Sequence, residues 1–96
     1  MKVSVVVPIY NEEEVLPELL RRVGAVLDGI DGTHEIILVD DGSGSEGAAA
    51  ARRLAEDREA VHLVRHRANL GKGAALRTGF GLVLDVAAEE DLVGVQ

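Results

Sequence analysis

Residues 35–47 read EIILVDDGSGSEG and combine a strand, a loop and a helix start in one short segment. Its first part, Glu35 to Asp40, is a short apolar, β-branched run that predicts a buried strand. The glycine-rich segment from Gly42 to Gly47 then predicts a loop. A second helix should follow, capped by Ser45 and running to about Asp57.

The same strand-then-helix unit precedes this stretch. Val3 to Ile9 reads VSVVVPI and predicts another buried strand. Asn11 is a suitable cap for a first helix, and Pro17 fits only near the start of that helix. Apolar residues recur at helical spacing along it: Val15, Leu16, Leu19, Leu20, Val23, Val26, Leu27 and Ile30. Gly29 and Asp31-Gly32 should end the segment.

The unit repeats again downstream. Val61 to Arg65 predicts a third strand, Asn69 to Gly73 (NLGKG) a tight loop, and Leu92 to Val95 a fourth strand. One apolar face marks the helix between the last two: Leu76, Phe80, Val83, Leu84 and Ala87. Strands and helices therefore alternate throughout. This alternation predicts an α/β fold, a Rossmann-like three-layer sandwich with a parallel sheet and helices on both faces.

Composition excludes several classes of protein. The 96 residues suffice for one small domain, and Tyr10 and Phe80 are its only aromatic residues. The absence of cysteine excludes a disulfide framework and thiolate chemistry. A net charge of −7 argues against nucleic acid as a partner. No apolar run approaches the ~20 residues that span a bilayer, so a cytoplasmic location is expected; an anchor at the cytoplasmic face of the membrane in a longer parent chain is compatible with it.

Three loops should meet beyond the carboxyl ends of the strands, where ligands of such sheets bind. They are Pro8–Glu12, Asp40–Gly44 and Arg65–Gly73. Basic residues without acidic ones gather in the last loop and just beyond it: Arg65, Arg67, Lys72 and Arg77. A cationic stretch on an acidic chain is a candidate anion site, although a solvated surface patch explains it equally well.

Asp40 and Asp41 are adjacent where the second strand ends. Two neighbouring carboxylates are costly to bring together unless something binds them. One can accept hydrogen bonds from backbone N–H groups of the loop, and the other can accept one from a ligand N–H, such as a nucleobase edge. An ordinary Asx-turn into a glycine-rich loop is the alternative.

Two glycine motifs and three histidines require separate interpretation. Gly42, Gly44 and Gly47 spell the dinucleotide-binding pattern, but the carboxylates just before them would repel a pyrophosphate. Gly71-Lys72-Gly73 suits a phosphate at a helix N-terminus without forming a Walker motif. The histidines show no metal-ligand spacing and are not expected to take a direct part in the site: His34, His62 and His66.

Taken together, three segments carry a resemblance to a known family. They are VSVVVPIYNEE at 3–13, ILVDDGS at 37–43 and NLGKGAALRTGF at 69–80. In this order they resemble family 2 glycosyltransferases, and within these the dolichol- and polyprenyl-phosphate sugar transferases. The resemblance covers essentially the whole chain. It implies the front half of a GT-A fold, with sheet order 3-2-1-4, and a nucleoside-diphosphate sugar as donor.

The resemblance also implies roles for particular residues. Pro8, Tyr10 and Glu12 would line the nucleotide pocket on the first loop. Val39 and Asp41 would contact the base and ribose, and Asp40 would shape its loop. Lys72 would lie near the phosphates and the acceptor. The nucleotide-binding residues implied are therefore Pro8, Tyr10, Glu12, Val39, Asp40, Asp41 and Lys72.

The chain departs from the family pattern at two places. Ser45 stands where Asp is common, but serine caps a helix equally well. The family places an Asp-x-Asp motif for Mg²⁺ or Mn²⁺ at the end of the fourth strand, whereas residues 91–96 read DLVGVQ and the sequence ends there. Neither metal ligands nor catalytic residues are therefore expected in this chain.

The resemblance thus implies transfer of a sugar from a nucleoside-diphosphate sugar to an acceptor such as a polyprenyl phosphate. Residues 1–96 would form the N-terminal nucleotide-sugar-binding part, truncated before the metal motif, and would be an incomplete catalyst on their own. Two alternatives remain open at this point. One is a non-catalytic nucleotide-binding module, and the other is a dinucleotide-binding oxidoreductase domain.

Overall fold

The computed structural model describes residues 2–86 and 91–94. The strands are β1 (Lys2–Ile9), β2 (Thr33–Asp40), β3 (Val61–Arg65) and β4 (Asp91–Gly94). The helices are α1 (Leu16–Asp28), α2 (Ser45–Glu56) and α3 (Lys72–Val86). Every element expected from the sequence is present. Ala87 and Val95, expected in the third helix and fourth strand, lie outside the described residues.

The four strands form one parallel sheet in the order β3-β2-β1-β4, as expected. Ile9 pairs with Asp40, and Asp40 pairs with Arg65. The carboxyl ends of β1, β2 and β3 therefore lie at the same level. The loops that follow these strands must start side by side, which is the condition for a ligand site at this edge.

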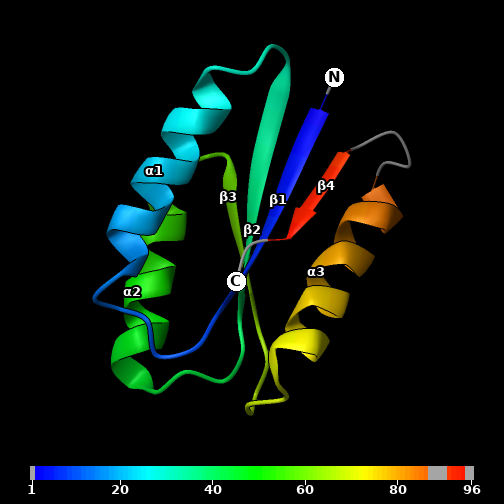
Figure 1. The fold of residues 1–96 in the computed structure, drawn as a ribbon. Coiled ribbons are helices and arrows are strands. Elements are labelled where there is room, and N and C mark those ends of the chain that lie inside the picture. The colour runs from blue at the N-terminus through cyan, green and yellow to red at the C-terminus, as the bar shows by residue number, and fades with distance from the viewer. Residues whose placement is uncertain (1, 87–90, 95–96) are drawn as a thin grey trace.

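Helices cover both faces of the sheet and give three layers (Figure 1). On one face, α1 and α2 pack through Leu16, Leu20 and Ala51 on apolar side chains of β1 and β2. On the other face, Ala75 and Val83 of α3 belong to a smaller apolar cluster with Val6, Ile37 and Val39. Because side chains alternate along a strand, the two clusters take alternate residues of β1 and β2.

Gly79 brings α3 unusually close to the sheet. A Cβ atom added at Gly79 would overlap Cγ1 of Val6 and would lie 3.2 Å from Cγ2 of Val39. The helix can therefore approach β1 and β2 closely only because this residue has no side chain. This contact places the middle of α3 directly against β1 and β2.

The expected caps of the first two helices are wrong. The first helix begins at Leu16 after Val15, and its first turn contains Pro17, as expected. Asn11 has a φ of 51° and lies outside the helix. The second helix is preceded by Gly44, without a side-chain cap, and Ser45 is its first residue. For the first helix, the physical reason is that the side chain of Asn11 is bonded to the N–H of Gly44 in another loop.

No helix in the described part of the chain has the length and apolar character needed to cross a membrane.

Candidate nucleotide site

Backbone hydrogen bonds hold the three strand ends together beyond the sheet. The N–H of Asp41 donates to the carbonyl of Ile9 over 2.9 Å. The N–H of His66 donates to the carbonyl of Asp40 over 2.8 Å. These bonds extend the pairing of β1, β2 and β3 by one residue and fix where their loops begin.

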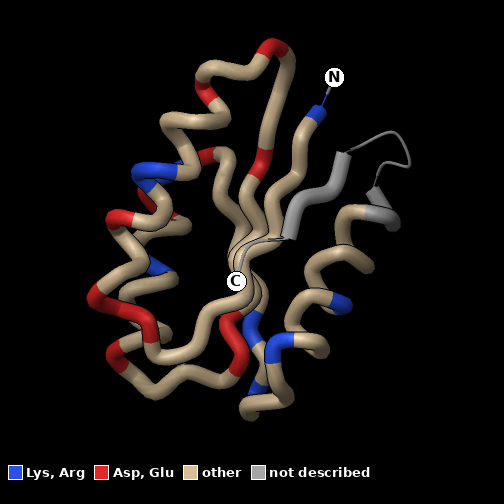
Figure 2. Tube along the Cα trace, in the orientation of Figure 1, with Lys and Arg blue, Asp and Glu red and all other residues tan. Residues whose placement is uncertain are grey.

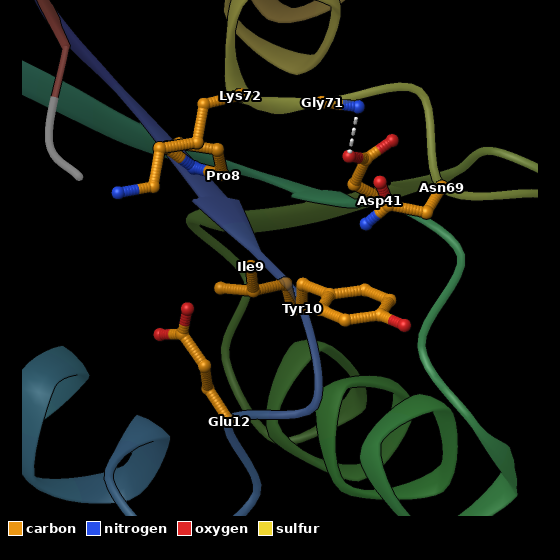
Figure 3. A pocket seen from close by; sticks show the side chains of 8 residues that line it. All are labelled: Pro8, Ile9, Tyr10, Glu12, Asp41, Asn69, Gly71 and Lys72. Atoms are coloured by element: carbon orange, nitrogen blue, oxygen red, sulfur yellow. Dashed lines mark hydrogen bonds between the residues drawn. The ribbon is translucent and has the colours of Figure 1, made fainter.

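A cavity of about 190 Å³ lies at this edge (Figure 3). Its lining comes from the end of β1 and the loop after it, from the residue that follows β2, and from the segment that leads into α3. The lining residues are Pro8, Ile9, Tyr10, Glu12, Asp41, Asn69, Gly71 and Lys72. Segments distant in the sequence are thus brought into one small, half-open site.

Asp41 is the buried charge of this cavity, with 3% of its surface exposed. Its Oδ1 accepts hydrogen bonds from Nδ1 of His66 over 2.7 Å and from the N–H of Leu70 over 2.9 Å. Its Oδ2 accepts one from the N–H of Gly71 over 2.7 Å (Figure 3). Burial acts to raise the pKa of Asp41, but these three donors outweigh burial and hold it below its ordinary value. The carboxylate is therefore ionised near neutral pH.

Asp40 is completely buried and has separate partners. Its Oδ1 accepts a hydrogen bond from the N–H of Ser43 over 2.9 Å. Its Oδ2 accepts one from Nε of Arg65 over 3.0 Å, which also forms an ion pair. The two adjacent carboxylates are thus bound by different donors. Asp40 shapes its own loop, whereas Asp41 faces the cavity.

Asn11 connects the first loop to the second. Its backbone N–H donates to Oγ of Ser43 over 2.8 Å, and its Oδ1 accepts from the N–H of Gly44 over 2.7 Å. Asparagine tolerates the left-handed backbone that this arrangement requires. Through Asn11 the position of Tyr10 and Glu12 depends on the loop that follows Asp41.

Two of the three glycines of the dinucleotide-like pattern serve close packing. A Cβ on Gly42 would overlap the backbone of Ala68 and Asn69, and its φ of 81° favours glycine. A Cβ on Gly47 would lie 3.0 Å from Cβ of Ser43 and 3.1 Å from Oε2 of Glu13. Close packing therefore explains Gly42 and Gly47 without a pyrophosphate, whereas a Cβ on Gly44 would make only an ordinary 3.6 Å contact with Oδ1 of Asn11.

Tyr10, Glu12 and Lys72 lie where a ligand could meet them. Tyr10 is 46% exposed, and its ring offers a flat face. Lys72 is exposed and is the first residue of α3, so its ammonium adds to the positive end of the helix. In Figure 3, the amine of Lys72 and the carboxylate of Asp41 lie on opposite sides of Pro8.

Val39 differs from the other expected site residues. Its side chain is completely buried and belongs to the cluster beneath α3. It does not line the cavity, so only its backbone remains for any contact with a ligand. Val39 lies next to the end of β2, but its side chain packs the core beneath α3.

The basic residues of the third loop and the start of α3 differ in whether a carboxylate neutralises them. Arg65 is neutralised by buried Asp40, whereas Arg67, Lys72 and Arg77 are exposed. In Figure 2, several blue segments lie close to the red segment at the lower end of the sheet. Of the exposed three, only Lys72 lines the cavity.

The three histidines differ in their distance from the cavity. His34 and His62 lie near the starts of β2 and β3, away from the cavity, and approach Asp28 and Glu35 respectively. His66 instead contacts Asp41, which sequence reasoning missed. Asn69 was missed as a lining residue as well. The available signal was their position in the third loop, since that loop converges with the other two.

Comparison with known proteins agrees with this arrangement. The model of glycosyl transferase family 2 matches residues 4–84, which is most of the chain. This chain belongs to glycosyl transferase family 2. The expected family is therefore confirmed, and the dinucleotide-binding alternative loses its support.

Two bacterial relatives of this family-2 chain are undecaprenyl-phosphate 4-deoxy-4-formamido-L-arabinose transferases. The protein from Sodalis glossinidius is 43% identical over 96 residues, covering 95% of this chain and 29% of the relative. The one from Pseudomonas fluorescens is 49% identical over 82 residues, covering 81% of this chain and 23% of the relative. The chain thus spans less than a third of the length of these relatives.

A solved structure confirms the GT-A type of fold. It is the mannosyltransferase PcManGT from Pyrobaculum calidifontis in complex with GDP-Man and Mn²⁺. It superimposes with a TM-score of 0.68 at 32% identity, covering 90% of this chain and 24% of that chain.

Proposed function

We propose that residues 1–96 form the nucleotide-sugar-binding part of a longer glycosyltransferase domain. The reaction would move a sugar from a nucleoside-diphosphate sugar to a polyprenyl-phosphate acceptor at the cytoplasmic face of a membrane. Family membership supports sugar transfer, and the names of the relatives support the acceptor class. The GDP-Man held by the structural neighbour supports the donor class.

The observation that carries this proposal is the make-up of the cavity. Tyr10 offers a ring face, Asp41 a fixed acceptor and Lys72 a cation, all at one edge of the sheet. A nucleoside diphosphate needs the same three features: a surface for its base, an acceptor for base N–H or ribose hydroxyl groups, and positive charge for its phosphates. The separation of Asp41 from Lys72 would orient the nucleotide along the cavity (Figure 3).

The roles of the cavity residues follow from their chemistry. Tyr10 would stack on the base, while Asp41 would accept from the base or ribose. Glu12 would accept from a hydroxyl group, and Pro8 would form the apolar floor. Lys72 would attract the diphosphate, assisted by the positive end of α3. Asp40 and Val39 would support the site from below.

A divalent metal is proposed for the complete enzyme, because the neighbour holds Mn²⁺. When bound, such an ion would offset the charge of the leaving diphosphate. Among residues 2–86 and 91–94, no group of three or more acidic or histidine side chains could hold it. The described residues therefore do not fit a metal, and their own part is to bind and orient the nucleotide.

Calorimetry with UDP, GDP, the monophosphates and the nucleosides tests the proposal. The chain should bind a nucleoside diphosphate, and Lys72→Ala should weaken diphosphate binding about 3- to 10-fold while hardly changing nucleoside binding. Arg67→Ala is the matched control, because Arg67 is also exposed and basic but does not line the cavity. Equal losses in both variants would contradict a phosphate role for Lys72. Binding of NADH in place of these nucleotides would contradict the proposed donor class.

A further inference from the structure

His66 is a largely buried residue that contacts Asp41 without lining the cavity. Only 11% of its side chain is exposed, and both ring nitrogens have partners. Nδ1 lies 2.7 Å from Oδ1 of Asp41, and Nε2 lies 2.8 Å from Oγ1 of Thr78 in α3. The imidazole therefore joins the end of β2 to the first turns of α3. It does not line the cavity itself.

The partners of His66 fix its tautomer. An ionised carboxylate only accepts hydrogen bonds, so Nδ1 must carry a proton toward Asp41. In the neutral ring, Nε2 then accepts from the hydroxyl of Thr78. In the protonated ring, Nε2 donates to the same hydroxyl, which can play either role. The bond to Asp41 thus persists in both protonation states of His66.

The distribution of donors leaves one oxygen of Asp41 available to a ligand. Oδ1 already accepts two hydrogen bonds, from His66 and Leu70, whereas Oδ2 accepts only the N–H of Gly71. A carboxylate has about four acceptor sites, two on each oxygen. Since Asp41 lines the cavity, the remaining acceptor site on its Oδ2 is the one left for a ligand.

We infer that His66 is a positioning residue, which holds the Asp41 carboxylate in one orientation and ties it to α3 through Thr78. This inference rests on the proposed nucleotide-binding function, because it assigns His66 an effect on the ligand through Asp41. The two backbone donors, Leu70 and Gly71, lie in a loop. His66 is the side-chain donor, and it is itself anchored by its N–H to the carbonyl of Asp40. Loss of the imidazole leaves Asp41 held by the loop alone.

Three substitutions of His66 separate its two hydrogen bonds. In His66→Asn the amide nitrogen can occupy the place of Nδ1 and keep the bond to Asp41. In His66→Gln the amide nitrogen falls near the place of Nε2 and can keep only the bond to Thr78. His66→Leu keeps neither bond but fills similar space. The asparagine variant is therefore the conservative rescue.

Nucleotide binding by these variants is the first readout. UDP or GDP affinity should fall about 10-fold in His66→Gln and His66→Leu, since a charged hydrogen bond is lost, and should stay within about 3-fold in His66→Asn. Urea unfolding of each variant verifies that the compared proteins are folded. Equal affinities of all three variants and the parent would overturn the inference. An equal loss in all three would overturn it too, because rescue by asparagine would have failed.

The pH profile of binding is the second readout, which a merely structural role would not move. Removing one of three donors should raise the pKa of Asp41, so the acid limb of binding should shift to higher pH in His66→Leu. The other charged groups near Asp41 are Asp40, Glu12 and Lys72, and they are the same in every variant. An unchanged acid limb in His66→Leu would contradict the inference.

NMR of the parent separates this inference from the proposed function. Long-range ¹H–¹⁵N spectra should show His66 protonated at Nδ1 in the neutral ring. A predominant Nε2–H tautomer would overturn the inference whether or not nucleotide binds. Failure of the parent to bind any nucleotide, with the Nδ1–H tautomer present, would instead refute the proposed function and the ligand-directed part of the role of His66.

Discussion

The N–H of Gly44 donates a 2.7 Å hydrogen bond to the side-chain Oδ1 of Asn11, 33 residues earlier in the chain. This bond joins the loop after β1 to the start of α2. The N–H of Asn11 donates in turn to Oγ of Ser43. The two loops that supply Tyr10 and Asp41 therefore form one unit.

Substitution of Asn11 should separate its backbone role from its side-chain role. Asn11→Ala should lower the free energy of unfolding by about 1–2 kcal/mol, because it loses the hydrogen bond and strains the left-handed backbone. Asn11→Gly should lose less, since glycine adopts this conformation easily. Asn11→Asp keeps the acceptor and should be the mildest. Urea denaturation measures all three, and a loss in Asn11→Gly as large as in Asn11→Ala would contradict the backbone contribution.

Two glycines of α3 should respond to alanine in opposite directions. Gly79→Ala should destabilise the protein by about 1–3 kcal/mol, since its Cβ would overlap Val6 between helix and sheet. Gly81→Ala is the matched control, because nothing lies within 4 Å of its added Cβ. It should gain up to about 1 kcal/mol from helix propensity. Thermal melts of the pair decide the matter, and a neutral Gly79→Ala would contradict the close approach of α3.

Asp41 should make stability depend on acid. Its pKa is lowered on folding, so the stability it contributes is present above the ordinary aspartate pKa of 3.8 and is lost as pH falls through the folded value. Asp41→Asn should remove this acid dependence and lower the free energy of unfolding by about 1–3 kcal/mol near neutral pH. The reason is that the NH₂ group of asparagine would face one of the N–H donors that now bind the carboxylate. Asp31→Asn, at an exposed position, is the control. Identical pH profiles for the parent and Asp41→Asn would rule out the ionised, hydrogen-bonded carboxylate.

Tyr10 should act through its ring. Tyr10→Ala should weaken nucleotide binding by about 1–3 kcal/mol, the usual contribution of an aromatic ring stacked on a base. Tyr10→Phe keeps the ring and should bind like the parent. Because the side chain is 46% exposed, neither change should greatly alter stability. A loss in Tyr10→Phe equal to that in Tyr10→Ala would point to the hydroxyl group instead of stacking.

The sequence predicted the sheet because alternation and apolar periodicity report burial directly. Strand order and the meeting of three loops followed from the connection rules of parallel sheets and from the family resemblance. The partners of individual polar side chains could not be predicted in this way. Asn11 has the chemistry of a helix cap, yet its side chain bonds to a loop 33 residues away.

The charge pattern of the sequence also did not reveal which acidic side chain each basic residue contacts. Arg65 and His66 adjoin each other in the basic stretch, yet one neutralises Asp40 and the other supports Asp41. Their assignment depends on which way successive side chains point after β3 ends. Val39 gives the opposite example. Its position near the carboxyl end of β2 does not reveal that its side chain packs beneath α3.

A nucleoside diphosphate should bind in the cavity at the carboxyl edge of the sheet. Titration of the ¹⁵N-labelled protein with UDP and GDP, followed by ¹H–¹⁵N spectra, tests it most directly. The amide signals of Tyr10, Asp41, Gly71 and Lys72 should shift with one shared dissociation constant, while those of His34 and His62 at the opposite end should stay in place. Shifts confined to other surfaces, or none with either nucleotide at millimolar concentration, would contradict the account.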